Sequence, residues 1–251
     1  MPKMFEFCNQ EFKNGRRHFK ALLYILQPPE CVIDGVGTLY NKNGITFLEK
    51  YSAQQLDSIK DMSVTVSFLD EERTLISDHG FTGMNSEDGM PTFDDATTVG
   101  HFTRGYIDDV EIDGEMYRAV FGEGYLDEMR YHAFVGHMIE ELNNGYGVEG
   151  SIEIYRDANH DSIVYEYGYK EKGRIPMYFI HSGWTFVLNA ADTNSRLIEI
   201  NNHKEEQIKM DENRIVEVIQ KTIHETNDAK EKYEQQIAEL NTAIQSKDQK
   251  I

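Results

Sequence analysis

Cysteine is scarce in this sequence, and that scarcity excludes two kinds of scaffold. The 251 residues contain only Cys8 and Cys31, with no CxxC motif. A disulfide framework needs several paired cysteines, and a structural zinc site needs about four closely spaced ligands. We therefore expect a protein of a reducing compartment that carries no structural metal and no cofactor.

Long apolar runs and excess basic charge are also missing. No apolar stretch approaches the ~20 residues that span a bilayer, and the first residues show no signal-peptide pattern. There are 25 Lys and Arg against 44 Asp and Glu, which gives a formal net charge of −19. Such a charge disfavours contact with nucleic acid or with an anionic membrane. The sequence predicts an intracellular protein that binds neither.

Aromatic residues and strand patterns are plentiful in the first 200 residues. The chain has 13 Phe and 14 Tyr, enough for a substantial core. Residues 62–68 alternate apolar and polar side chains, which is typical of a half-buried strand. One hairpin is predicted over 99–125, turning at Asp113-Gly114, and another over 32–48, turning at Asn41–Gly44. We expect a mostly β domain with flanking helices, of the α+β class.

One helix is predicted to precede a candidate strand. Asp127 is a suitable capping residue, and Gly145 can end the helix after Asn144. Its apolar residues share one face: Tyr131, Val135, Met138 and Leu142. The strand that follows, residues 148–154, places Ser151 near its start, with the small Gly150 leaving space in front of it.

Composition divides the chain into three parts. Residues 1–19 form a polar lead-in, residues 20–200 the β domain, and residues 201–251 a tail without Gly, Pro, Phe or Trp. A heptad pattern in the tail predicts an extended helix that self-associates as a coiled coil over residues 208–251. The positions that carry it most clearly are Tyr233, Ile237, Leu240, Ile244 and Ile251. The pattern is still running at the last residue, so the helix is predicted to be incomplete.

Three side chains are candidates for nucleophilic chemistry. A serine nucleophile needs a neighbouring base, and the base needs an orienting group. Ser151 is the candidate nucleophile. His79 ends a predicted strand, 75–79, before the Gly-rich loop 80–97, and His181 lies in an apolar strand. Each also has an ordinary interpretation: a small strand residue, a turn residue and a buried core histidine.

The order of these motifs resembles a known family. Strand-ending Leu75–His79 is followed by Val99–Tyr106, Phe121–Asp127 and, after the helix, Leu142–Glu153. This outline is similar to the prohead (capsid maturation) serine proteases of tailed bacteriophages, whose fold is related to the herpesvirus assemblin proteases. The resemblance covers roughly residues 30–200. It implies a small herpesvirus-protease-like β-barrel, to which the helical tail would be a fused scaffold-like segment.

The resemblance also implies roles and partners. Ser151 would be the nucleophile and His79 the general base. Because 181–184 lacks the family's carboxylate, His181 is the expected third member, with Asp192 and Asp78 as fallbacks. The substrates would be scaffold segments, major capsid protein segments and the chain itself, inside the assembling prohead in the host bacterial cytoplasm.

Two other classes of protein stay open. One is a catalytically inactive capsid assembly or scaffolding protein with a protease-like domain, favoured by the missing acid and the strong tail pattern. The other is a metal hydrolase using Asp78, His79 and either His101 or the pair His132 and His137. No HExxH motif occurs, and two histidines five residues apart lie on different faces of a helix.

Overall fold

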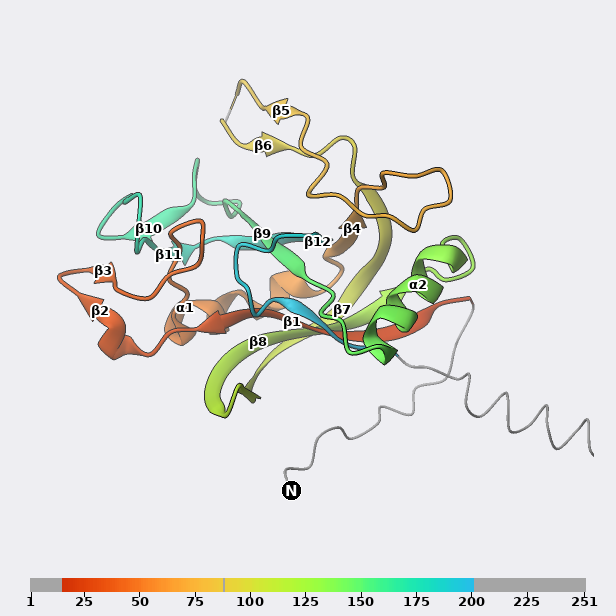
Figure 1. The fold of residues 1–251 in the computed structure, drawn as a ribbon. Helices are drawn as coiled ribbons and strands as arrows, with labels where there is room; N and C mark the ends of the chain where they lie inside the picture. Colours follow the sequence, from red (N-terminus) through yellow and green to blue (C-terminus); the bar gives the residue numbers. More distant parts are fainter. Residues whose placement is uncertain (1–14, 88, 201–251) are drawn as a thin grey trace, which may run out of the picture. The chain divides into compact units, whose positions relative to one another are not determined.

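A seven-stranded sheet organises the protein. The computed structural model describes residues 15–87 and 89–200, which belong to one compact unit. All neighbouring strands of the sheet are antiparallel except β4 and β12, which are parallel. In spatial order the strands are β13 (Arg196–Ile200), β1 (Arg17–Leu26), β8 (Glu115–Leu126), β7 (Thr97–Ile112), β4 (Ser63–Val66), β12 (Ile180–Phe186) and β9 (Gly150–Tyr155) (Figure 1).

The predicted fold class is wrong, because this sheet does not close into a barrel. Its edge strands are β13 and β9. They approach each other only at an isolated bridge between Glu149 and Arg196, so no ladder of hydrogen bonds joins the two edges. Alternating apolar and polar residues specify strands, but they do not specify closure, which requires a consistent tilt and stagger around the whole sheet.

The remaining elements are short. Three two-stranded ribbons lie outside the main sheet: β2 (Val32–Ile33) with β3 (Val36–Gly37), β5 (Gly83–Met84) with β6 (Pro91–Thr92), and β10 (Val164–Glu166) with β11 (Ile175–Tyr178). Among the described residues, the helices are α1 (Glu49–Ser52), α2 (His132–Asn143) and the 3-10 helices η1 (Pro29–Cys31) and η2 (Ala53–Ile59). Figure 1 shows the β5–β6 ribbon projecting from the sheet.

Turn chemistry explains one confirmed hairpin and one error. The β7–β8 hairpin turns at Asp113 and Gly114, whose φ angles of 53° and 85° are those of a tight hairpin turn. The hairpin predicted over 32–48 is wrong: β2 pairs with β3 around Asp34-Gly35, also at positive φ. The predicted turn at Asn41–Gly44 does form, since the Gly44 N–H donates to the Asn41 carbonyl at 2.8 Å, but the residues on either side of it form no paired strands.

Helix α2 packs its apolar stripe on the core as predicted. Val135 and Met138 are buried, and Tyr131 and Leu142 pack beside them. Gly145 ends the helix region at φ 76°. The helix begins at His132, not at Asp127, because residues 127–131 form a turn in which the Asp127 carbonyl accepts the Tyr131 N–H at 3.0 Å.

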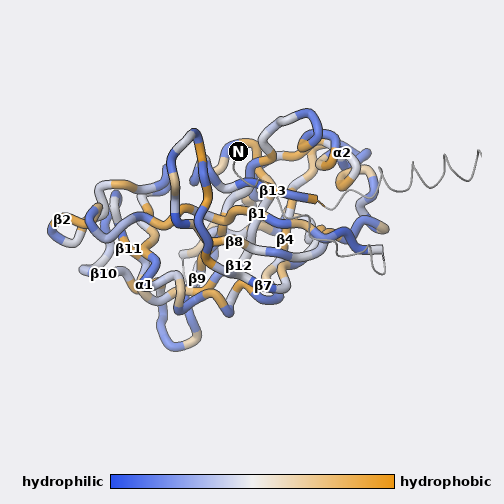
Figure 2. The backbone as a smooth tube through the Cα atoms, turned by 90° about the horizontal axis from the view of Figure 1, so that it is seen from below, coloured by the Kyte–Doolittle hydropathy of each residue, from blue (hydrophilic) through white to orange (hydrophobic). Residues whose placement is uncertain are grey.

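The main core lies between one face of the sheet and α2. Its largest fully buried side chains include Trp184, Tyr24, Phe102, Phe134 and Phe186. Hydrophobic residues gather along the central strands, whereas the outer loops are mostly hydrophilic (Figure 2). Burial of such side chains stabilises a fold by roughly 1.5–3 kcal/mol each before entropy is counted. Trp184 and Phe186 therefore fix the face of β12 that points inward.

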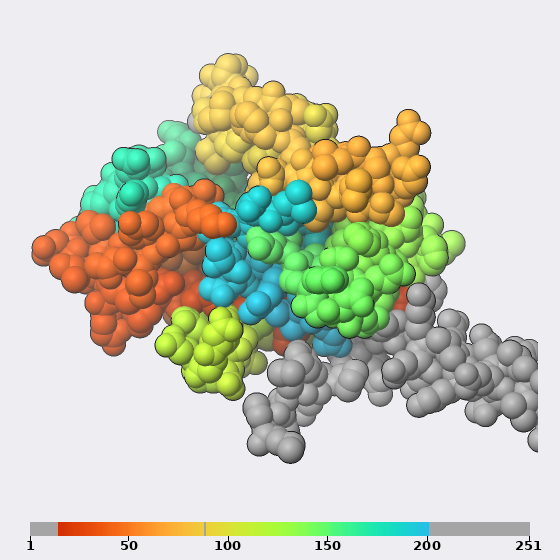
Figure 3. Space-filling view, viewed as in Figure 1, coloured from red at the N-terminus to blue at the C-terminus, as the bar shows by residue number. Residues whose placement is uncertain are grey.

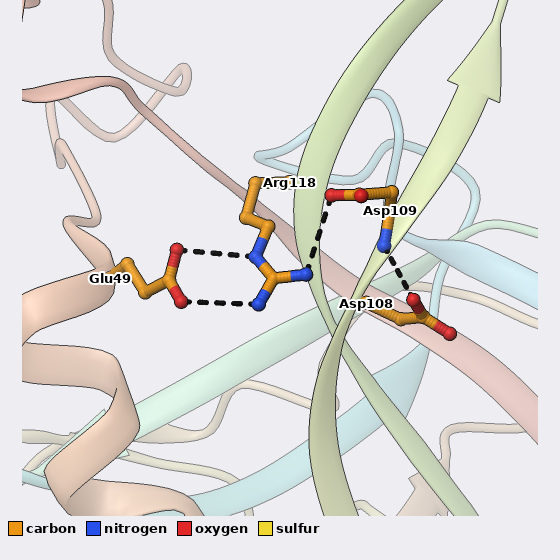
Figure 4. A network of polar contacts seen from close by, with 4 residues as sticks. All are labelled: Glu49, Asp108, Asp109 and Arg118. Atoms are coloured by element: carbon orange, nitrogen blue, oxygen red, sulfur yellow. Dashed lines mark hydrogen bonds and ion pairs between the residues drawn. The ribbon is translucent and has the colours of Figure 1, made fainter.

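An arginine ties the β7–β8 hairpin to α1. The Arg118 guanidinium donates to both carboxylate oxygens of Glu49 at 3.2 Å and to Asp109 at 3.3 Å (Figure 4). Water reaches these ion pairs, since all three side chains are at least 40% exposed. The network orients the hairpin more than it stabilises it, because exposed ion pairs contribute little.

Two further predictions concern the ends of the domain. Strand β1 begins at Arg17, inside the predicted lead-in, and Phe19 is fully buried. The predicted coiled coil over 208–251 lies outside the described residues. Within residues 15–87 and 89–200, no helix is long and apolar enough to cross a membrane.

Candidate active site

Strand β9 presents two functional side chains on one face. Gly150 and Ile152 face the core: Ile152 packs against it, and any side chain at Gly150 would collide with the Trp184 ring. Because side chains alternate along a strand, Ser151 and Glu153 point to the opposite face. The prediction that Gly150 leaves space in front of Ser151 is therefore wrong; the space is filled by Trp184 on the core side.

A row of hydroxyls crosses the sheet beside Ser151. Thr185 of β12 is the register partner of Ser151, Thr65 of β4 is the partner of Thr185, and Thr98 of β7 is the partner of Thr65. The hydroxyls of Thr65 and Thr185 are hydrogen-bonded at 2.7 Å. This face of the sheet is polar, whereas the opposite face holds Trp184. The alternation of side chains along the strands therefore places the candidate catalytic residues on one face and the core on the other.

His79 and Glu153 form the central contact of the site. The Nδ1 atom of His79 lies 2.8 Å from Glu153 Oε1. The Thr185 hydroxyl donates to the same oxygen at 2.6 Å. A carboxylate can only accept, so the neutral imidazole carries its proton on Nδ1 and leaves Nε2 as a free acceptor. Among the described residues, nothing hydrogen-bonds to His79 Nε2.

The site is sheltered but open to solvent. The His79 side chain is 26% exposed and that of Glu153 is 19% exposed. Phe93 lies against the imidazole, with 5.2 Å between ring centroids. Ser151 is 5% exposed, and its hydroxyl has no hydrogen-bond partner among the described residues. The arrangement contains a serine, an oriented histidine and a carboxylate on one surface of the sheet.

Gly183 leaves room for the carboxylate. It is the register partner of Glu153 across the β12–β9 pair. A methyl group at this position would come within 2.5 Å of Glu153 Oε2. The glycine therefore allows Glu153 to lie over β12 and reach His79.

The predicted strand before His79 is absent. Only Ile76 makes a bridge, to Phe68, and residues 77–79 lie outside any strand. The Ser77 N–H donates to the Ser67 carbonyl at 2.8 Å, which holds this loop beside the end of β4. The loop, not a strand end, carries His79 over the polar face.

The structure places His181 on the other face of the sheet. The β12–β9 register shifts between His181 and Gly183, and such a bulge reverses the alternation of side chains. His181 is 3% exposed, and its ring packs near Tyr24 and Phe179. Its partners are Tyr24, Ser58 and Gln55, whereas His79 is held by Glu153.

The hydrogen bonds of His181 fix its neutral form. Its Nδ1 lies 3.1 Å from the Gln55 carbonyl and 2.8 Å from the Ser58 hydroxyl, so Nδ1 carries the proton. Its Nε2 accepts the Tyr24 hydroxyl at 2.8 Å. Burial lowers the pKa of His181 to about 4. The residue is a satisfied core histidine.

The fallback acids serve other purposes. Asp192 accepts the backbone N–H groups of Ile25 at 3.0 Å and Asn194 at 2.9 Å, which fixes the loop before β13. Burial raises the pKa of Asp192. Asp78 is exposed beside His79, and its side chain makes no hydrogen bond or ion pair with the residues that the structure describes.

The histidines of the metal alternative are dispersed. His101 pairs in register with Ser63 and Tyr125 within the sheet, whereas the side chain of His132 is 85% exposed, 3.7 Å from Glu128. Within the part of the chain that the structure describes, no group of three or more His, Cys, Asp and Glu side chains is arranged to hold a metal ion.

Glu153 is the residue that sequence reasoning missed. The family resemblance places the carboxylate in the closing strand, near 181–192. The signal was nevertheless present in Ser151-Ile152-Glu153, because two residues separated by one lie on the same face of a strand.

The described residues define an open, mostly antiparallel β-sheet protein with a His–Glu pair on the same face as a serine. A family model described as the YonD N-terminal domain matches residues 27–239, and the chain belongs to this family. The match supports a phage-related protein and assigns no activity. No curated protein and no solved structure shows significant similarity to the chain.

Proposed function

We propose that this protein is a serine endopeptidase in which Ser151 is the nucleophile, His79 the general base and Glu153 the group that orients the base. The observation that carries the proposal is the 2.8 Å contact between His79 Nδ1 and Glu153 Oε1. Ser151 lies two residues before Glu153 on the same face of β9, within the same small surface. A carboxylate on Nδ1 and a free Nε2 are the features that a serine hydrolase requires.

The chemistry follows from these three side chains. His79 Nε2 takes the Ser151 hydroxyl proton while Oγ bonds to the peptide carbonyl carbon. The protonated imidazole then gives that proton to the departing amine, and the C–N bond breaks. Water releases the acyl group by the same steps, with His79 again as base. Glu153 stabilises the imidazolium form and keeps the ring in one orientation.

The biological substrate is proposed from family and resemblance together. The family match suggests a phage-related protein, and the order of the chain's motifs is similar to that of prohead proteases. We therefore propose that it cleaves scaffold segments, capsid-protein segments and itself during prohead maturation in the host bacterial cytoplasm. The excess of acidic residues fits a protein that must leave the shell without retaining DNA.

A fluorophosphonate probe, which phosphonylates activated serines, tests the proposed nucleophile. Intact-mass and peptide-mass spectrometry of the full chain should find one label, on Ser151. Ser151→Ala and His79→Ala should abolish it, whereas the exposed Ser162→Ala should label like the unmodified protein. Absence of label on Ser151 in a folded protein would overturn the proposal.

A non-catalytic assembly protein is the second candidate. The favouring observation is that Ser151 is only 5% exposed and has no hydrogen bond to His79. In this case His79, Glu153 and Thr185 would simply stabilise the loop over the sheet. Co-expression with a capsid protein distinguishes the two functions. If the protein is an assembly protein, the unmodified chain and its Ser151→Ala variant alter particle formation equally, and neither the chain nor the capsid protein is shortened.

A further inference from the structure

An apolar cleft lies beyond the end of the β9–β12 pair at which Ser151 is located, and Ser151, His79 and Glu153 do not line it. It has a volume of about 320 Å³, in the range of small ligand pockets. Three parts of the chain meet around it: the 69–76 hairpin, helix α2, and the residues just before β9 and just after β12, which are 147–149 and 187–188. In Figure 3 the orange hairpin lies beside green α2. The residues that shape its apolar wall are Leu75, Ile76, Met138, Val148, Val187 and Leu188.

The cleft lies at the end of the β9–β12 pair, between α2 on the core side and the strand residues that follow the polar face. The Val187 N–H donates to the Glu149 carbonyl at 3.2 Å, which extends the β12–β9 pair by one step beyond Thr185 and Ser151. Residues two apart on a strand are about 7 Å apart, so the cleft begins about that far from Ser151. A substrate held at Ser151 reaches the cleft within a few residues of extended chain.

The opposite wall leads directly to the base. The 69–76 hairpin is closed by the Leu69 N–H, which donates to the Leu75 carbonyl at 2.9 Å, and by the bridge from Phe68 to Ile76. His79 follows Ile76 by three residues. The cleft is therefore bounded by the segments that carry both candidate catalytic groups.

The lining selects the chemistry of an occupant. Three leucines at the cleft are largely exposed: Leu69 at 66%, Leu75 at 58% and Leu188 at 58%. The only carboxylates in the lining are Glu141 and Glu149, and no lysine or arginine lines it. Removing apolar surface from water lowers the free energy, so the cleft favours an apolar side chain. The two carboxylates repel an anionic side chain.

The edge of the sheet adds a place for an extended backbone. The outer edge of β9 is occupied at its start, where the Gly150 N–H donates to the Ser195 carbonyl at 3.1 Å and the Leu197 N–H donates to the Val148 carbonyl at 2.8 Å. Beyond Gly150, within residues 15–87 and 89–200, β9 pairs only with β12. An unpaired edge strand accepts an extended peptide through main-chain hydrogen bonds, while neighbouring pockets select side chains. The open part of the edge, from Ile152 to Ile154, and the cleft lie on either side of Ser151 along the strand, so one extended polypeptide that used both would pass Ser151.

We propose that this cleft is a specificity pocket, and that it takes one aliphatic side chain of an extended polypeptide substrate a few residues from the bond that Ser151 attacks. This inference rests on the proposed peptidase function. It names the substrate class: segments of unfolded or flexible polypeptide with leucine, isoleucine or methionine near the cleavage point, and without an acidic residue at that subsite.

Cleavage of a proteome-derived peptide library by the full-length chain tests the inference. Mass spectrometry of the products should show aliphatic residues enriched at one subsite close to the cleaved bond. Leu75→Asp and Leu188→Asp should lower kcat/KM for a selected aliphatic peptide at least tenfold, mainly through KM. Leu39→Asp is the matched control, because Leu39 is a 51% exposed leucine that does not line the cleft, and it should cleave normally.

The outcomes separate this inference from the peptidase proposal. Fluorophosphonate label on Ser151 together with an unselective subsite, or with cleft variants that cleave at the normal rate, would overturn the pocket and leave the peptidase intact. A folded protein without label on Ser151 would overturn both. Size-exclusion chromatography tests whether a second copy of the chain occupies the cleft. If Leu75→Asp or Leu188→Asp dissociates an oligomer, a second copy occupies it and the inference fails.

Discussion

Gly183 lies directly opposite Glu153 across the β12–β9 pair, and the glycine leaves the room that the carboxylate occupies. The first prediction follows. In Gly183→Ala the added methyl meets Glu153 Oε2 at 2.5 Å, so the carboxylate must shift, and its other oxygen is the one that contacts His79. We expect the rate of fluorophosphonate labelling at Ser151 to fall at least tenfold, with the circular dichroism spectrum retained. Normal labelling would show that the Glu153 position has no role in reactivity.

Replacing the carboxylate itself tests the same contact more directly. Glu153→Gln keeps the shape but removes the charge that stabilises an imidazolium, and its amide can favour the wrong tautomer of His79. We expect the labelling rate of Ser151 to fall on the order of 10²-fold or more, as for other orienting carboxylates. The control is Glu171→Gln, because Glu171 is an exposed glutamate outside the site; equal rates in both variants would contradict the assignment.

His181 predicts a pH dependence of stability. Its pKa is about 4 in the folded protein, against 6.5 for an exposed histidine. Between these values the unfolded chain binds a proton that the folded protein does not, so stability decreases as pH falls from 6.5 towards 4. The full loss is about 3 kcal/mol. Urea unfolding at several pH values measures it.

The control for that prediction is His181→Gln, whose amide does not titrate. Its unfolding free energy should vary less over the same pH range, even if it is lower at pH 7. Labelling of Ser151 should stay within about threefold of the unmodified protein, because His181 lies on the core face. A loss like that of Glu153→Gln would return His181 to the catalytic group.

Gly136 offers a stabilising substitution in α2. It lies in the middle of the helix without positive φ, and a methyl group there would meet no atom within 4 Å. Gly136→Ala should raise the unfolding free energy by about 0.5–1 kcal/mol, because alanine loses less backbone freedom than glycine. Thermal and urea unfolding check this. A decrease would contradict the open space that the structure places beside Gly136.

Local patterns predicted the elements better than their arrangement. The Asp113-Gly114 turn and the apolar stripe of α2 were readable because each depends on neighbours a few residues away. The barrel was wrong because closure depends on all strands together. Strand β13 was not predicted, since its Arg196–Ile200 sequence acquires a partner only when β1 lies beside it.

The same distinction applies to the site. Ser151 and Glu153 lie on one face by strand alternation, which the sequence contains. The contact of His79 with Glu153 joins residues 74 positions apart, and no local pattern encodes it. The orientation of His181 was inverted by a one-residue bulge before Gly183, which shifts the register without a clear mark in the sequence.

The order of strands has a consequence for when the site can exist. Strand β12 lies between β4 and β9, and β13 pairs with β1 at the edge of the sheet. Segments late in the sequence therefore complete a sheet whose other strands come earlier in the sequence. Thr185, which holds Glu153, arrives only with residues 180–186. Contacts over such separations form slowly and after local ones. A ribosome-bound chain that has not yet extended past β12 therefore has no assembled site, which delays any self-cleavage until the domain has been made.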